Sequence, residues 1–186
     1  MAGQRSSRPR IGDIVEIETL VGLAYAQYTH KHQMMGYLIR VLPGLHSERP
    51  HAFSDLVRQP ERFYVFFPLG AAVARAIVKI VAHAEVPEQC RPFPLFRSGT
   101  RNTETGEETW WLWDGEREWR VGRLDPEQRK LPSRSIWNDT LLVERIVAGW
   151  SPEDEVPALV PALSEVQQRI ANTTDGRAGK GGRKRA

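Results

Sequence analysis

The chain has 186 residues, which is the size of one ordinary domain and excludes a (β/α)8 barrel of roughly 250 residues. Hydrophobic residues make up 40% of the chain, enough for a core, yet no run approaches the roughly 20 apolar residues of a membrane span. The first residues lack the apolar segment of a secretory signal, and the single Cys90 cannot form an internal disulfide. We therefore expect a cytoplasmic protein without membrane contact.

The net charge of +3 comes from the two ends of the chain. Residues 1–10 carry +3 and residues 171–186 carry +4, whereas residues 11–170 hold 18 basic and 22 acidic side chains, a net charge of −4. The ends are rich in Gly, Ser, Arg and Lys, a composition typical of disorder. We expect a disordered basic N-terminus at 1–10 and a disordered basic tail at 171–186, with weak binding to nucleic acid at most. The acidic body suits a basic protein partner instead.

The first half of the chain predicts a β-meander. Apolar and polar residues alternate over 11–17, with Ile14 or Val15 inward according to register, and the same period recurs over 23–30 and 37–42. Glycines stand between these runs, as hairpins need. Three consecutive short strands of this kind predict a small curved antiparallel sheet or a partly open barrel.

The next stretch is less regular. A loop over 45–60 contains one helical turn, and the aromatic run 63–67 indicates a buried strand. Residues 71–81 combine helix-favouring alanines with strand-favouring Val and Ile, and we predict a strand there, with helix as the alternative. Three prolines in 87–94 predict an extended crossing without regular pairing.

Residues 109–122 predict a hairpin, because aromatic-rich runs flank Asp114-Gly115, a dipeptide that favours a tight turn. Asp125 is then expected to cap a short helical turn that begins at Pro126. A helix is expected from Asn138 or Asp139, and its apolar stripe consists of Leu141, Leu142 and Ile146.

These elements predict an α+β chain that is mainly β, with a C-terminal helix. Residues 11–155 form the single β-rich domain, and residues 156–170 could form one further helix. The chain contains no internal repeat.

His30 and His32 are the candidate metal ligands. Two imidazoles separated by one residue on a strand point to the same side and could share a metal ion. The alternative is a polar strand end that leads into an exposed loop. Cys90 has no evident catalytic partner, and the chain lacks nucleophile-elbow, phosphate-loop, dinucleotide and paired-cysteine motifs. We therefore assign no catalytic residue and no cofactor.

The tryptophan hairpin is the candidate partner-binding site. Alternation places Trp111 and Trp113 on one face and Trp110 on the other, so they cannot all fill one core. An exposed Trp beside Asp114 and Glu116 is typical of a protein-binding hot spot, and the acidic surroundings oppose a polyanion. The alternative is that the hairpin only covers the core.

Seven segments together resemble the bacterial immunity protein 26 family, also labelled phosphotriesterase HocA-like. In chain order they are IGDIVEI at 11–17, GLAYAQYTH at 22–30, LIRVLPG at 38–44, FFPLG at 66–70, RPFPLFR at 91–97, WLWDG at 111–115 and IWNDTLL at 136–142. The resemblance spans about 11–155 and implies a small, mostly β protein that neutralises a bacterial toxin without a cofactor. The second label implies phosphotriester hydrolysis.

The leading hypothesis is a non-enzymatic immunity protein that occludes a polymorphic bacterial toxin. The first alternative is a small metal-dependent phosphotriester or phosphoester hydrolase that uses His30 and His32. The second is a nucleic-acid-associated small β-barrel whose basic ends contact phosphates.

Overall fold

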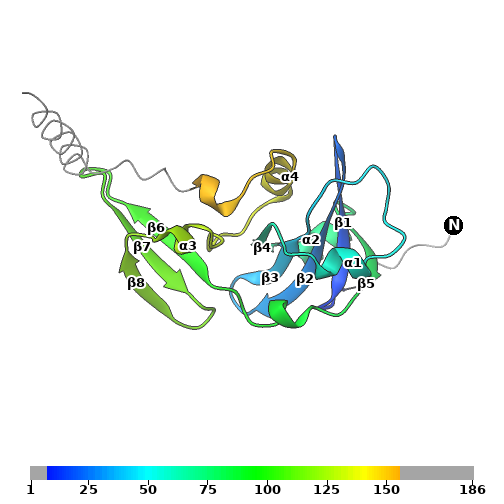
Figure 1. Ribbon diagram of the computed structural model, residues 1–186, viewed down its shortest axis with the longest axis horizontal. Helices are drawn as coiled ribbons and strands as arrows, with labels where there is room; N and C mark the ends of the chain where they lie inside the picture. The colour runs from blue at the N-terminus through cyan, green and yellow to red at the C-terminus, as the bar shows by residue number, and fades with distance from the viewer. Residues whose placement is uncertain (1–7, 156–186) are drawn as a thin grey trace, which may run out of the picture. The chain divides into compact units, whose positions relative to one another are not determined.

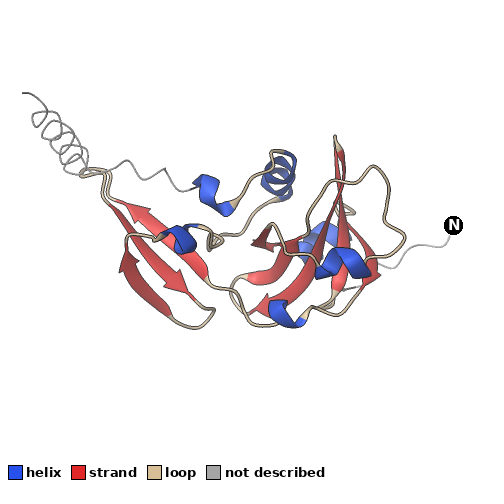
Figure 2. Ribbon diagram, viewed as in Figure 1, coloured by secondary structure: helices blue, strands red, loops and turns tan. Residues whose placement is uncertain are grey.

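The computed structural model describes residues 8–155, which form two antiparallel sheets and a few short helices (Figures 1 and 2). The chain divides into two units, 1–155 and 156–186, and the second lies outside the described residues. The helix expected at 156–170, the tail at 171–186 and most of the N-terminus at 1–10 therefore lie outside them as well. The mainly β fold expected from the sequence is confirmed.

The larger sheet contains five strands in the order β4-β3-β2-β1-β5. The strands are β1 (Asp13–Thr19), β2 (Gly22–His32), β3 (Gly36–Val41), β4 (Phe63–Phe67) and β5 (Lys79–His83). Every neighbouring pair is antiparallel, and β1, β2 and β3 follow one another as the expected meander. The sheet does not close into a barrel, because β4 and β5 remain edge strands.

Both faces of this sheet are covered, so Ile14 and Val15 are both fully buried. Val15 belongs to a core in which α4 (Asp139–Val147) contributes Leu142 and Ile146. Ile14 belongs to a second core on the other face, where it packs with residues of α1 (Ser54–Arg58). The alternating pattern predicted one inward residue, whereas a helix on each face makes both positions internal.

The strand predicted over 71–81 is wrong for most of its length. Helix α2 (Leu69–Ala74) occupies the first part, and β5 begins only at Lys79. Between them the N–H of Ala76 donates to Val73 O (3.1 Å) and the N–H of Ile77 donates to Ala72 O (2.9 Å). These bonds form a Schellman helix end, in which Ala76 takes the left-handed conformation (φ 56°) that glycine usually supplies. Because no glycine marks the end of the helix, the sequence pattern runs through it without a break.

The smaller sheet has the order β6-β7-β8 and consists of β6 (Phe96–Arg101), β7 (Glu108–Trp113) and β8 (Glu118–Gly122). The expected hairpin is β7–β8, although its loop contains four residues, 114–117, rather than a two-residue turn. Strand β6 was not predicted, because it follows three prolines and contains a glycine. The proline-rich segment before it is irregular as expected, with one short 3-10 turn, η1 (Glu88–Cys90).

One segment, 132–137, links the edges of the two sheets. Ser133 forms a parallel bridge with Arg97 of β6, and Ile136 forms one with Phe66 of β4. It lies between α3 (Pro126–Arg129) and α4, and η2 (Pro152–Glu155) ends the described chain. Helices α3 and α4 both start where the sequence predicted. The side chains of Asp125 and Asn138 accept hydrogen bonds from backbone N–H groups in the first turns of these helices. The remaining free edges among the described residues are therefore those of β5 and β8.

Candidate functional site

The tryptophans of the hairpin fall on opposite faces of the smaller sheet, as alternation predicts. Trp113 is buried (3% exposed) and packs against Phe66 and Phe96 where the two sheets meet. It therefore belongs to the core rather than to a binding surface. Trp111 is half-buried on the same face of the sheet.

Trp110 lies on the other face and is half-buried against the backbone of β6. A Cβ on Gly99 would lie 2.6 Å from Cζ3 of the Trp110 ring, so the ring occupies the space that a side chain would need. The Arg97 guanidinium lies 5.4 Å from the centre of the same ring. These contacts hold Trp110 in one orientation while part of its surface remains accessible.

Trp119 is the most exposed tryptophan among the described residues (41%), and the sequence analysis did not single it out. It lies on β8, the free edge strand, directly opposite Leu112 of β7. Residues paired across neighbouring strands lie on the same face of a sheet, so Trp119, Leu112 and Arg97 share one face. This face carries Trp110, whose ring contacts Arg97. The signal that could have identified it is its place on the outer strand of the hairpin, which has a neighbouring strand on one side only.

The carboxylates of the hairpin loop have different roles. Asp114 accepts hydrogen bonds from the backbone N–H groups of Glu116 (2.9 Å) and Arg117 (2.7 Å), and these bonds, that to Arg117 foremost, lower its pKa. Asp114 therefore shapes the turn. Glu116 is exposed and remains available to a partner. The surface that the structure offers on this face thus consists of Trp119 and part of Trp110, with Glu116 in the adjoining loop, whereas Trp111 lies on the opposite face of the sheet.

His30 and His32 lie on the same side of β2, as expected, because both rings contact Phe93. Their nitrogens, however, bond to the backbone. His32 Nδ1 accepts N–H groups from Met34 (3.3 Å) and Met35 (3.1 Å), so Nε2 carries the proton and donates to Gly115 O at 3.1 Å. A metal ion needs a free nitrogen lone pair, and His32 in this tautomer has none to offer.

His30 is occupied at one ring nitrogen only. Its Nε2 lies 2.8 Å from Arg91 O, while its Nδ1 is buried and has no hydrogen-bond partner. Within residues 8–155, no group of three or more His, Cys, Asp or Glu side chains is arranged to hold a metal ion. The two imidazoles thus attach β2 to the segment around Arg91 and to the hairpin loop at Gly115.

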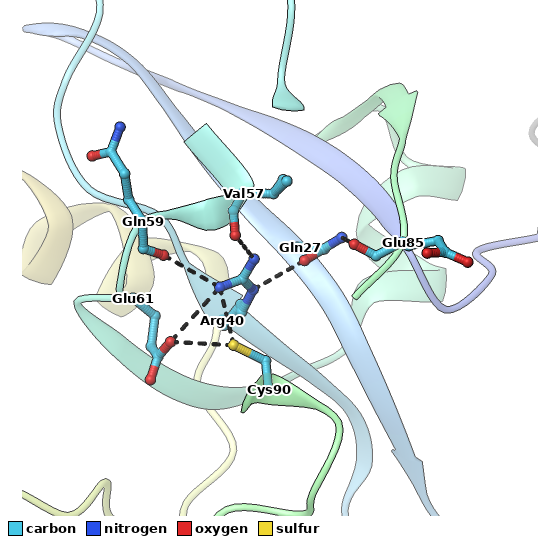
Figure 3. Close-up of polar contacts among 7 residues, drawn as sticks. All are labelled: Gln27, Arg40, Val57, Gln59, Glu61, Glu85 and Cys90. Atoms are coloured by element: carbon cyan, nitrogen blue, oxygen red, sulfur yellow. Dashed lines mark hydrogen bonds and ion pairs between the residues drawn. The ribbon is translucent and has the colours of Figure 1, made fainter. Parts of the chain in front are cut away.

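A second polar centre, which the sequence analysis did not predict, surrounds the fully buried Arg40 of β3 (Figure 3). Its Nε donates to Gln27 Oε1 (3.0 Å), and Nη2 donates to Val57 O near the C-terminal end of α1. Nη1 donates to Cys90 Sγ (3.3 Å) and lies 3.7 Å from Glu61 Oε2. The buried positive charge of Arg40 is tolerated because hydrogen-bond acceptors surround the guanidinium.

This centre joins segments that are distant in sequence. Gln27 Nε2 donates to Ala84 O (2.9 Å) after β5. The Cys90 thiol donates to Glu61 Oε2 (3.7 Å) (Figure 3). Burial raises the pKa of the nearby Tyr64 phenol far above its usual value. Cys90 is itself buried, so the arrangement ties β2, β3, α1 and η1 together and presents no open nucleophile.

The hypothesis of nucleic-acid binding rests on the chain ends, of which the structure describes only residues 8–10. None of the helices within 8–155 has the length and apolar character needed to cross a lipid bilayer.

No protein-family model, no curated protein and no solved structure matches the chain.

Proposed function

We propose that this protein is a non-enzymatic cytoplasmic binding protein that neutralises a bacterial toxin by occluding it. The observation that carries the proposal is the exposed Trp119 on the free edge strand β8, on the same face as the partly accessible Trp110. Tryptophan is enriched among the residues that dominate binding energy at protein interfaces. A rigid sheet that holds such rings in fixed orientations lowers the entropic cost of binding.

The class of partner follows from charge and from the resemblance described above. The net charge of −4 over residues 11–170 favours encounter with a basic protein partner, such as a nuclease toxin. The immunity role itself rests on the similarity to the immunity protein 26 family. The metal-dependent alternative has no comparable support, since His32 would have to give up at least the two hydrogen bonds that its Nδ1 accepts before it could bind a metal ion.

The test is to look for a toxin gene directly upstream of this gene and to titrate the protein calorimetrically with the toxin domain that such a gene encodes. Trp119→Ala is expected to weaken binding by about 2 kcal/mol or more, which is roughly thirtyfold. Leu20→Ala is the matched control, because Leu20 is a fully exposed apolar side chain on the β1–β2 turn, away from β8. Equal losses of binding affinity for the two variants would contradict the proposal. The absence of a neighbouring toxin gene together with the absence of binding to a toxin domain would contradict it as well.

A further inference from the structure

A groove with an apolar floor lies where α4 crosses the larger sheet. Its floor consists of Ile17 of β1, Phe67 of β4, Val78 and Leu142, each of them buried. Ile77 and Val143 form its upper walls, and Ile77 is 40% exposed. The Schellman turn at the end of α2 places Ile77 there, since it reverses the chain immediately before this residue.

The rim of the groove is acidic. Glu18, Asp139 and Glu144 line it, and within residues 8–155 the one ion pair of Lys79 is with Glu18. Among the described residues, neither Asp139 nor Glu144 forms an ion pair, and both are exposed on α4. Two carboxylates without cations above an apolar floor are complementary to a cationic segment that also carries an apolar side chain.

The size of the groove narrows the choice of occupant. Its volume is about 290 Å³. A cavity of roughly 150 Å³ holds one benzene ring, so this groove holds about two such groups. That is small for a cofactor and sufficient for one or two apolar side chains of a peptide.

The apolar surface continues beyond the groove along α4. Val147 follows Val143 by one helical turn, so it lies on the same side of the helix, and it is 41% exposed. A partner helix that anchors one side chain in the groove would therefore cover Val147 with the next turn. A second copy of this chain would bring its own carboxylates to the rim, where like charges repel.

We propose that this groove binds an amphipathic basic segment of a protein partner, with an apolar side chain in the groove and Lys or Arg side chains on Asp139 and Glu144. The surface consists of β1, β4, the α2–β5 turn and α4, and shares no residue with the tryptophan hairpin. The inference therefore goes beyond the proposed function and does not depend on it.

The test uses the full chain and a short helical peptide of leucine and lysine, with a second peptide in which glutamate replaces lysine. Binding is followed by the NMR signals of the methyl groups. The basic peptide is expected to shift the signals of Ile17, Ile77 and Val143 selectively, and the acidic peptide is expected not to bind. No binding, or shifts spread evenly over the acidic surface, would overturn the proposal.

Two variants separate the groove from charge alone. Asp139→Lys with Glu144→Lys is expected to weaken binding of the basic peptide at least about tenfold. The control, Glu48→Lys with Glu153→Lys, makes the same change in net charge at exposed positions outside the groove and is expected to leave most of the affinity. Equal losses of affinity in both double variants would show a nonspecific attraction and refute the proposed binding of the peptide in the groove. Self-association of the unaltered chain through this surface, measured by sedimentation, would refute it as well.

Discussion

The buried guanidinium of Arg40 provides the sharpest test of how this fold is stabilised. Replacing Arg40 by methionine keeps much of the side-chain volume and removes every donor. Four acceptors then lose a donor inside the protein: Gln27 Oε1, Val57 O, Cys90 Sγ and the more distant Gln59 O at 3.5 Å. The carboxylate of Glu61 also loses its cation.

The cost follows from burial. An unsatisfied buried acceptor costs about 1–3 kcal/mol, and breaking a buried ion pair costs about 3–5 kcal/mol in total. Glu61 is 27% exposed and can recover water, so we expect Arg40→Met to destabilise the protein by about 3–5 kcal/mol. For a domain of this size, that lowers the melting temperature by roughly 10 °C.

The assay is equilibrium unfolding in urea, followed by tryptophan fluorescence and circular dichroism. Arg58→Met serves as the control, since Arg58 is 74% exposed and its pairing with Asp55 lies in water. It is expected to change the free energy of unfolding by less than about 1 kcal/mol. If Arg40→Met also costs less than about 1 kcal/mol, Arg40 does not hold these segments together and the reasoning fails.

Three further predictions concern other parts of the chain. Ala76→Gly relieves the left-handed backbone at the end of α2 and should raise the free energy of unfolding by about 0.5–1 kcal/mol, and a loss would contradict the Schellman assignment. Gly99→Ala forces the Trp110 ring to move and should lower stability and alter the tryptophan emission, and an unchanged spectrum would refute the close contact. The hydrogen bonds from Arg49 to Glu16 hold the pKa of that carboxyl below its ordinary value of 4.5, so they stabilise the fold above that pH. This stability is lost as the pH falls below about 4.5, and Glu16→Gln should flatten the acid limb of an unfolding curve measured against pH. A variant with an unchanged slope would show that other groups cause the acid dependence.

The strands that were predicted correctly carry their information locally. The alternation in 11–17 and the aromatic run 63–67 each identify a strand without reference to the rest of the chain. Helix starts are equally local, since Asp125 and Asn138 accept N–H groups only three residues away. Where the local signal was ambiguous, as at Ala76, the prediction failed.

The candidate site was less predictable because exposure depends on what covers each face. Alternation separated Trp110 from Trp113, yet contacts with residues distant in the sequence, such as Phe66 in the other sheet, make Trp113 internal. Likewise, the spacing of His30 and His32 correctly placed them on one side of β2. The backbone groups that occupy their nitrogens come from residues 34–35, 91 and 115, and no spacing within the strand reveals them.

The sequence by itself determined the strands of the meander, the hairpin, the helix caps and the separation of basic ends from an acidic body, because each depends on neighbours within a few residues. The tertiary structure alone decided that both faces of the larger sheet are buried, that Arg40 meets Cys90 and Glu61, and that Trp119 rather than Trp113 reaches the surface. The physical reason is that burial and pairing between segments tens of residues apart arise from packing, which residue types and their local order leave open.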